Sequence, residues 1–99
     1  MQSWQTKSVE ELCEAILTLK TKEECAAFLE DICTIKEIQD LSQRLEVAQM
    51  LSQGICYATI CKETGASTAT ISRVSRSYEY GAGGYKKVIA RLNKEKNNA

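Results

Sequence analysis

Apolar side chains recur along the chain at the three- and four-residue intervals of α-helices, and no stretch alternates as a β-strand would. The first predicted helix has an apolar stripe of Val9, Leu12, Cys13, Ile16 and Leu17. The second predicted helix is expected to have on its inward face Cys25, Phe28, Leu29 and Ile32. The third presents on one face Ile38, Leu41, Leu45, Ala48 and Leu51. The pattern predicts an all-α protein.

Local signals mark where these helices begin and end. Thr21 with Glu24, and Thr34 with Glu37, have the spacing of capping boxes, in which the hydroxyl and the carboxylate satisfy free backbone N–H groups. Gly54 stands where a glycine ends a helix. The sequence therefore predicts starts for the second and third helices and a stop for the third.

The second half of the chain predicts three further helices. Two short ones lie on either side of Gly65, and a last one runs from about Tyr85 to Asn93 after the glycine-rich turn 81–84. We expect the ends, residues 1–7 and 94–99, to be frayed. In total, the sequence predicts six helices and no strand.

The chain has 99 residues, enough for a single domain, residues 1–99, with a thin core. Six short helices leave apolar faces that need partners, so we expect a homodimer. No apolar run is as long as a membrane span and no secretory signal opens the chain, so we expect a cytoplasmic protein without a membrane partner.

The composition argues against catalysis and metal binding. The chain has no histidine, the commonest general base and metal ligand. Its five cysteines include no Cys-x-x-Cys pair, so we expect no zinc site, and Cys13, Cys25 and Cys33 are interpreted as small apolar residues. The turn 81–84 lacks the preceding strand of a dinucleotide-binding loop. We expect no enzymatic activity and no cofactor.

The net charge of zero hides an uneven distribution. Residues 1–56 contain five Lys or Arg and ten Asp or Glu, whereas residues 57–99 contain eight Lys or Arg and three Glu. A basic half favours an anionic partner, although both halves could simply be solvated surface.

Residues 57–76 have the pattern of a helix-turn-helix. Gly65 is at the turn, where a left-handed backbone is needed, and the small Cys61 is where the second helix crosses closely. Ile71 and Val74 would hold the second helix, 67–77, against the first, and Ser67 would cap it. The sequence predicts that this second helix enters the major groove of double-stranded DNA.

The residue types of the outward face suit that role. Small side chains allow a close approach to base edges, hydroxyls can bond bases or phosphates, and arginine can bind guanine or phosphate. The predicted DNA contacts on this helix and its cap are Ser67, Thr68, Ala69, Ser72, Arg73 and Arg76. Thr59 and Lys62 on the preceding helix could reach the DNA backbone.

Segment Glu63–Val74 (Glu-Thr-Gly-Ala-Ser-Thr-Ala-Thr-Ile-Ser-Arg-Val) is similar to the DNA-reading part of the tryptophan repressor. Together with Asp31–Gln39, Leu41–Ala48 and Tyr80–Tyr85, it resembles the Trp-repressor superfamily and, more closely, its YerC/YecD-like branch. The likeness covers about residues 8–92. It implies a six-helix fold, an intertwined homodimer and a transcriptional regulator.

The resemblance also raises the question of a corepressor. Arg44 and Arg73 match the two arginines that flank the bound indole in the tryptophan repressor. The next residue, a glycine there, is Val74 here, and its side chain would intrude on the ring. We therefore do not expect tryptophan as corepressor, although another small effector stays open. The interpretation we favour makes Arg44 a paired surface or interface residue and Arg73 a DNA contact.

Two hypotheses for function follow. The first is a dimeric, sequence-specific DNA-binding regulator, most simply a repressor. The second is a helical protein–protein interaction module without DNA binding, whose docking surface would be the acidic half of the chain with Trp4. The outer face of residues 67–76 lacks the large apolar side chains of a protein-docking helix, which favours the first.

Overall fold

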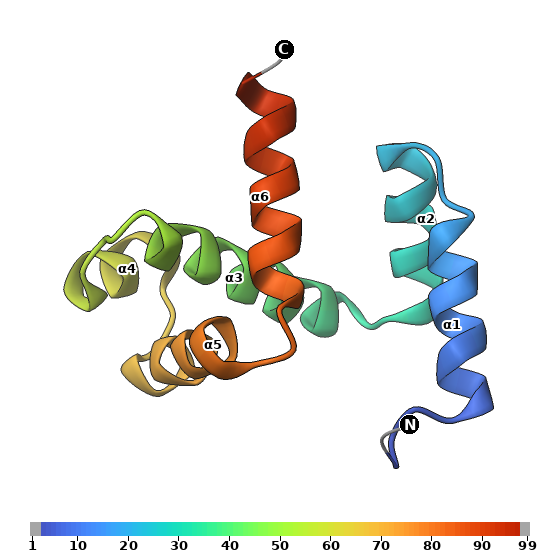
Figure 1. Ribbon diagram of the computed structural model, residues 1–99, viewed down its shortest axis with the longest axis horizontal. Coiled ribbons are helices and arrows are strands. Elements are labelled where there is room, and N and C mark those ends of the chain that lie inside the picture. The colour runs from blue at the N-terminus through green and yellow to red at the C-terminus, as the bar shows by residue number, and fades with distance from the viewer. Residues whose placement is uncertain (1–2, 98–99) are drawn as a thin grey trace. The chain divides into compact units, whose positions relative to one another are not determined.

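The computed structural model describes residues 3–97, and every regular element among them is an α-helix (Figure 1). In chain order the helices are α1 (Lys7–Leu17), α2 (Lys22–Ile32), α3 (Ile35–Ser52), α4 (Tyr57–Thr64), α5 (Thr68–Tyr80) and α6 (Gly84–Asn97). The predicted six-helix, all-α fold is confirmed. Across this described part of the chain, no helix combines the length and the apolarity needed to cross a bilayer.

The capping box of Thr34 and Glu37 forms as predicted, and that of Thr21 and Glu24 forms in part. The backbone N–H of Glu37 donates to Thr34 Oγ1 (3.1 Å), and the N–H of Thr34 donates to Glu37 Oε1 (2.8 Å). At α2 the N–H of Glu24 donates to Thr21 Oγ1 (3.1 Å), while Glu24 Oε1 accepts from the N–H of Lys20, one residue before the cap (3.1 Å). These bonds satisfy N–H groups that have no partner within the helix, and so define where α2 and α3 begin.

The helical ends extend further than predicted. α6 continues to Asn97, so the expected fraying of residues 94–97 is wrong. At the other end the Thr6 hydroxyl accepts from the N–H of Val9 and caps α1, which begins at Lys7. No helix-ending glycine or proline follows Gly84, and Lys94 and Lys96 in the last turn favour the negative end of the helix dipole. Residues 1–2 and 98–99 lie outside the described residues.

The sequence predicts one domain, whereas the contacts within the chain divide it into two compact units, residues 1–38 and 39–99. In the first unit α1 and α2 form a helical hairpin, and neither helix has a buried residue. Cys25 is exposed and Ile32 is 51% exposed, so the expectation that both face inward is wrong for the single chain. Two eleven-residue helices offer each other too little surface to cover their apolar stripes.

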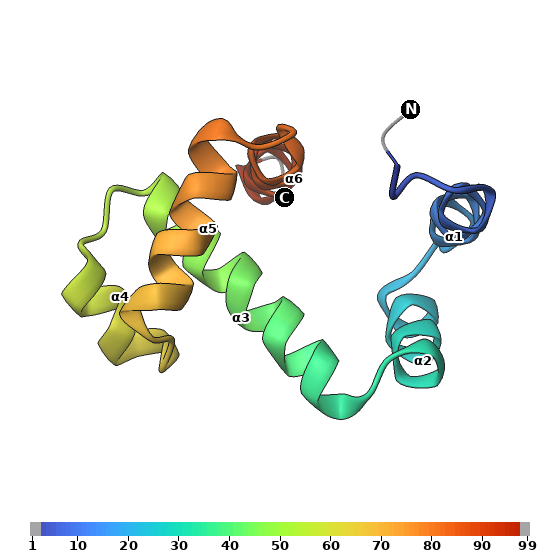
Figure 2. The same cartoon turned by 90° about the horizontal axis from the view of Figure 1, so that it is seen from below.

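The second unit contains the core. α3, α4, α5 and α6, with the turn between α4 and α5, contribute seven buried residues: Val47, Ala48, Ile60, Ala66, Ile71, Val74 and Ile89. α5 lies across α3, and α6 follows it after a short turn (Figure 2). Because Ile71 and Val74 are on α5, this core holds α5 in place within the unit.

Candidate nucleic-acid interface

A left-handed glycine makes the turn between α4 and α5. Gly65 has φ = 75°, and its N–H donates to the carbonyl oxygen of Cys61 (2.9 Å). The next N–H, of Ala66, donates to Thr64 Oγ1 (3.1 Å), and Ala66 itself is buried. An added Cβ at Gly65 would meet no atom within 4 Å, so the backbone conformation, and not space, requires glycine. The predicted turn is confirmed.

α5 is capped where the sequence predicts. The N–H of Thr70 donates to Ser67 Oγ (3.1 Å), which satisfies one of the free N–H groups of the first turn. The helix ends at Tyr80, three residues beyond the predicted end at 77. It stops at Gly81, where a Cβ would collide with the carbonyl oxygen of Ser77.

The two faces of α5 differ sharply. Ile71 and Val74 are buried, with 0% and 3% of their surface exposed, and hold the helix against the core. The residues predicted to read DNA all lie exposed: Ser67, Thr68, Ala69, Ser72, Arg73 and Arg76. Over residues 67–76 the predicted reading surface therefore consists of small, hydroxyl-bearing and cationic side chains.

α4 presents the other two predicted contacts. Thr59 and Lys62 are both exposed on this helix. Cys56 occupies the cap position without a side-chain bond to the free N–H groups, as its poor capping ability predicts. Its Sγ lies 3.3 Å from Thr59 Oγ1, and this hydrogen bond lowers the pKa of the Cys56 thiol.

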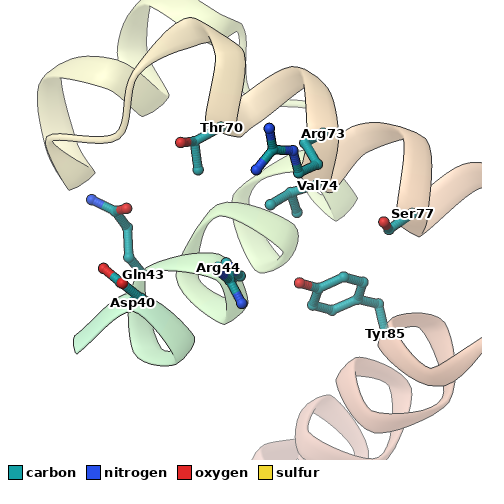
Figure 3. Close-up of a pocket in the computed structure, with 8 residues that line it drawn as sticks. All are labelled: Asp40, Gln43, Arg44, Thr70, Arg73, Val74, Ser77 and Tyr85. Carbon is teal, nitrogen blue, oxygen red and sulfur yellow. The ribbon is translucent and has the colours of Figure 1, made fainter. Parts of the chain in front are cut away.

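A pocket of about 460 Å³ is lined by residues of α3, α5 and α6. Figure 3 shows these residues. Arg44 on α3 and Arg73 on α5 both line it, so the structure brings together the pair that matches the indole-flanking arginines. In the described residues 3–97 Arg44 is exposed and forms no ion pair, so the expected pairing is not found within the chain. A role for Arg44 at an interface with a second chain stays a prediction. Val74 lines the pocket as well, but its side chain is almost wholly buried in the core.

Sequence reasoning missed five further residues of this pocket: Asp40, Gln43, Thr70, Ser77 and Tyr85. Asp40 precedes Arg44 by four residues, and Thr70 and Ser77 lie three before and four after Arg73, so helical spacing could have indicated these three. Gln43 is next to Arg44 in the sequence, and helical spacing does not indicate it. Tyr85 belongs to α6 and reaches the pocket only through the tertiary fold.

The chain is similar to known proteins over most of its length. The family model of the Trp repressor protein matches residues 7–93. The uncharacterized protein YerC of Bacillus subtilis is 54% identical over 86 residues, which are 87% of this chain and 83% of YerC.

Two solved structures are also similar over nearly the whole chain. One is a candidate Trp repressor from Staphylococcus aureus, with a TM-score of 0.89, 53% identity and coverage of 94% of this chain and 95% of that one. The other is a TrpR-like protein from Eubacterium eligens, with a TM-score of 0.87, 55% identity and coverage of 90% and 92%. The chain belongs to the Trp repressor family.

Proposed function

We propose that the protein is a sequence-specific, DNA-binding transcriptional regulator that acts as a homodimer and represses transcription by occupying its site. The observation that carries the proposal is the division of α5 into a buried apolar face and an exposed small and basic face. A helix held this way can enter the major groove without disturbing its own packing. Membership of a family named for a repressor supports the same class of function.

The exposed face has the chemistry for both parts of DNA recognition. Thr68 and Ala69 are in the first turn of α5, the part of a recognition helix that contacts base edges. Their methyl groups suit the methyl group of thymine, and Ser72 can bond a base edge or a phosphate. Arg76, one turn further on, can bind guanine or the backbone. No large apolar side chain on this face obstructs the approach.

Unpartnered apolar surface supports the homodimer. A groove of about 460 Å³ in the second unit is lined almost entirely by apolar atoms, from Leu45, Ser77, Ala82, Gly84, Tyr85 and Val88. The α1–α2 hairpin exposes the apolar side chains of Leu12, Ile16, Leu17 and Ile32. Exposed apolar surfaces of this kind mark protein–protein interfaces. In a dimer, the apolar groove of one copy could be covered by the α1–α2 hairpin of the other copy.

The charges of the two units agree with this pairing. Residues 1–38 contain four Lys and eight Asp or Glu, a net charge of −4, whereas residues 39–99 contain nine Lys or Arg and five Asp or Glu, a net charge of +4. The acidic unit of one copy is therefore attracted to the basic unit of another. Two α5 helices would then enter successive major grooves about 34 Å apart on a roughly palindromic site.

Replacing Arg76 with alanine is expected to weaken binding to the protein's preferred duplex by about 1–3 kcal/mol. Arg76 is exposed on α5, so its truncation removes a DNA contact without opening a cavity in the core. Fluorescence anisotropy with labelled duplex measures the change, and single base-pair variants of the duplex show whether the preference at one position is relaxed.

The matched control is Arg91→Ala, which removes the same charge from the exposed surface of α6. Equal losses of affinity from the two variants would mean that Arg76 contributes only to the overall charge. No loss from Arg76→Ala would contradict the assignment of this face to DNA.

A further inference from the structure

The α3–α5 pocket holds two guanidinium groups that have no ion-pair partner. Arg44 and Arg73 enter it from different helices, and no carboxylate of residues 3–97 forms an ion pair with either of them. Asp40 is the one acidic residue in the lining, so the pocket has a net positive charge. Two exposed guanidinium groups that line one pocket can bind an anion with several oxygens.

Hydroxyl groups complete the chemistry of the pocket. Thr70 and Ser77 flank Arg73 along α5, and Tyr85 approaches from the start of α6 (Figure 3). Thr70 Oγ1 accepts a bond from Ser67 Oγ (3.1 Å), which leaves the Thr70 hydroxyl hydrogen for another acceptor. Gln43 is already engaged, because its Nε2 donates to the carbonyl oxygen of Thr64 (3.2 Å). The lining therefore offers mainly donors to an oxygen-rich ligand.

We infer that this pocket binds a backbone phosphate of the DNA itself, with Arg44 as a DNA contact outside the helix-turn-helix. The inference rests on the proposed function and adds to it a residue that lies on α3, thirteen positions before the first residue of α4. Arg73 belongs both to the pocket and to the exposed face of α5 that is proposed to read DNA. A phosphate that flanks the groove entered by α5 thus comes within reach of both arginines.

The pocket fits a phosphate of a larger ligand better than a small aromatic effector. Small-molecule sites enclose most of their ligand between apolar walls, whereas Arg44 and Arg73 are exposed here. The one aliphatic residue in the lining, Val74, has 97% of its surface covered within the core. The same burial holds α5 against the core without any ligand. We therefore expect DNA binding without an effector.

The test is the salt dependence of DNA binding by the purified full chain. Each phosphate contact contributes about 1 to the slope of log K against log salt, because a condensed counterion is released. Arg44→Gln is expected to reduce the magnitude of the slope by about 2 in a dimer, and to weaken binding to all sequences alike. Arg44→Lys retains the charge and should therefore retain the slope. It should lose some affinity, because lysine cannot make the bidentate contact of arginine with a phosphate.

Arg91→Gln is the matched control, since it removes one charge from a residue of α6 that does not line the pocket. A slope for Arg44→Gln equal to that of the wild type or of Arg91→Gln would overturn the inference. So would DNA binding by the wild type that appears only when 1 mM tryptophan or another small effector is added. Failure of the wild type to bind any DNA would instead reject the proposed function.

Discussion

Replacing Ile71 with alanine is expected to lower the free energy of unfolding by about 2–5 kcal/mol. Ile71 has no exposed surface and packs in the core with residues of α3, α4 and α6. Truncation removes apolar contacts and leaves a cavity that a close-packed interior fills only partly. The loss is a large fraction of the roughly 5–15 kcal/mol that stabilises a small protein. Since Ile71 holds α5, DNA binding should weaken at temperatures where the variant begins to unfold.

Urea unfolding followed by circular dichroism measures this loss. Ile71→Leu is the control, because it retains the volume and should cost less than about 1.5 kcal/mol. A loss below 1 kcal/mol for the alanine variant would show that α5 is not held by the core as described.

Replacing Val88 with aspartate is expected to weaken DNA binding by about 100-fold or more. Val88 lines the apolar groove of the second unit and is 47% exposed, so the single chain should tolerate the change. In the proposed dimer the same carboxylate would be buried against the acidic α1–α2 hairpin of the other copy, at a high desolvation cost. Loss of the dimer removes the gain of roughly 10²–10⁴ that two linked binding modules have over one.

Ala90→Asp is the matched control, because it adds the same charge to an exposed position on another side of α6. Analytical ultracentrifugation measures the mass of the protein in solution, and fluorescence anisotropy measures its affinity for DNA. A Val88→Asp protein that stays dimeric and binds DNA as tightly as the wild type would show that this groove is not the interface.

The features that sequence reasoning predicted correctly depend on neighbouring residues. The capping box of Thr34 and Glu37, the cap by Ser67 and the left-handed Gly65 are each determined within about one helical turn. The buried pair Ile71 and Val74 follows from spacing along one helix. Such signals were enough to predict all six helices and the orientation of α5.

The features that were missed depend on the tertiary fold or on a second chain. The pocket combines residues of α3, α5 and α6, and nothing near Tyr85 in the sequence indicates that it faces Arg44 and Arg73. The spacing of apolar residues in α2 predicts an inward face, but Ile32 remains 51% exposed within its own chain. Periodicity shows that a face is apolar and does not show what covers it.

The proposal that this family member is a dimeric, sequence-specific DNA-binding protein is tested most directly by selection of bound duplexes from a random pool, without added effector. The proposal predicts enrichment of a two-fold symmetric sequence whose half-sites are about 34 Å apart, and loss of that enrichment for Arg76→Ala. Recovery of no sequence above the starting pool at low salt, together with co-purification of a stable protein partner, would contradict it and would favour an interaction module.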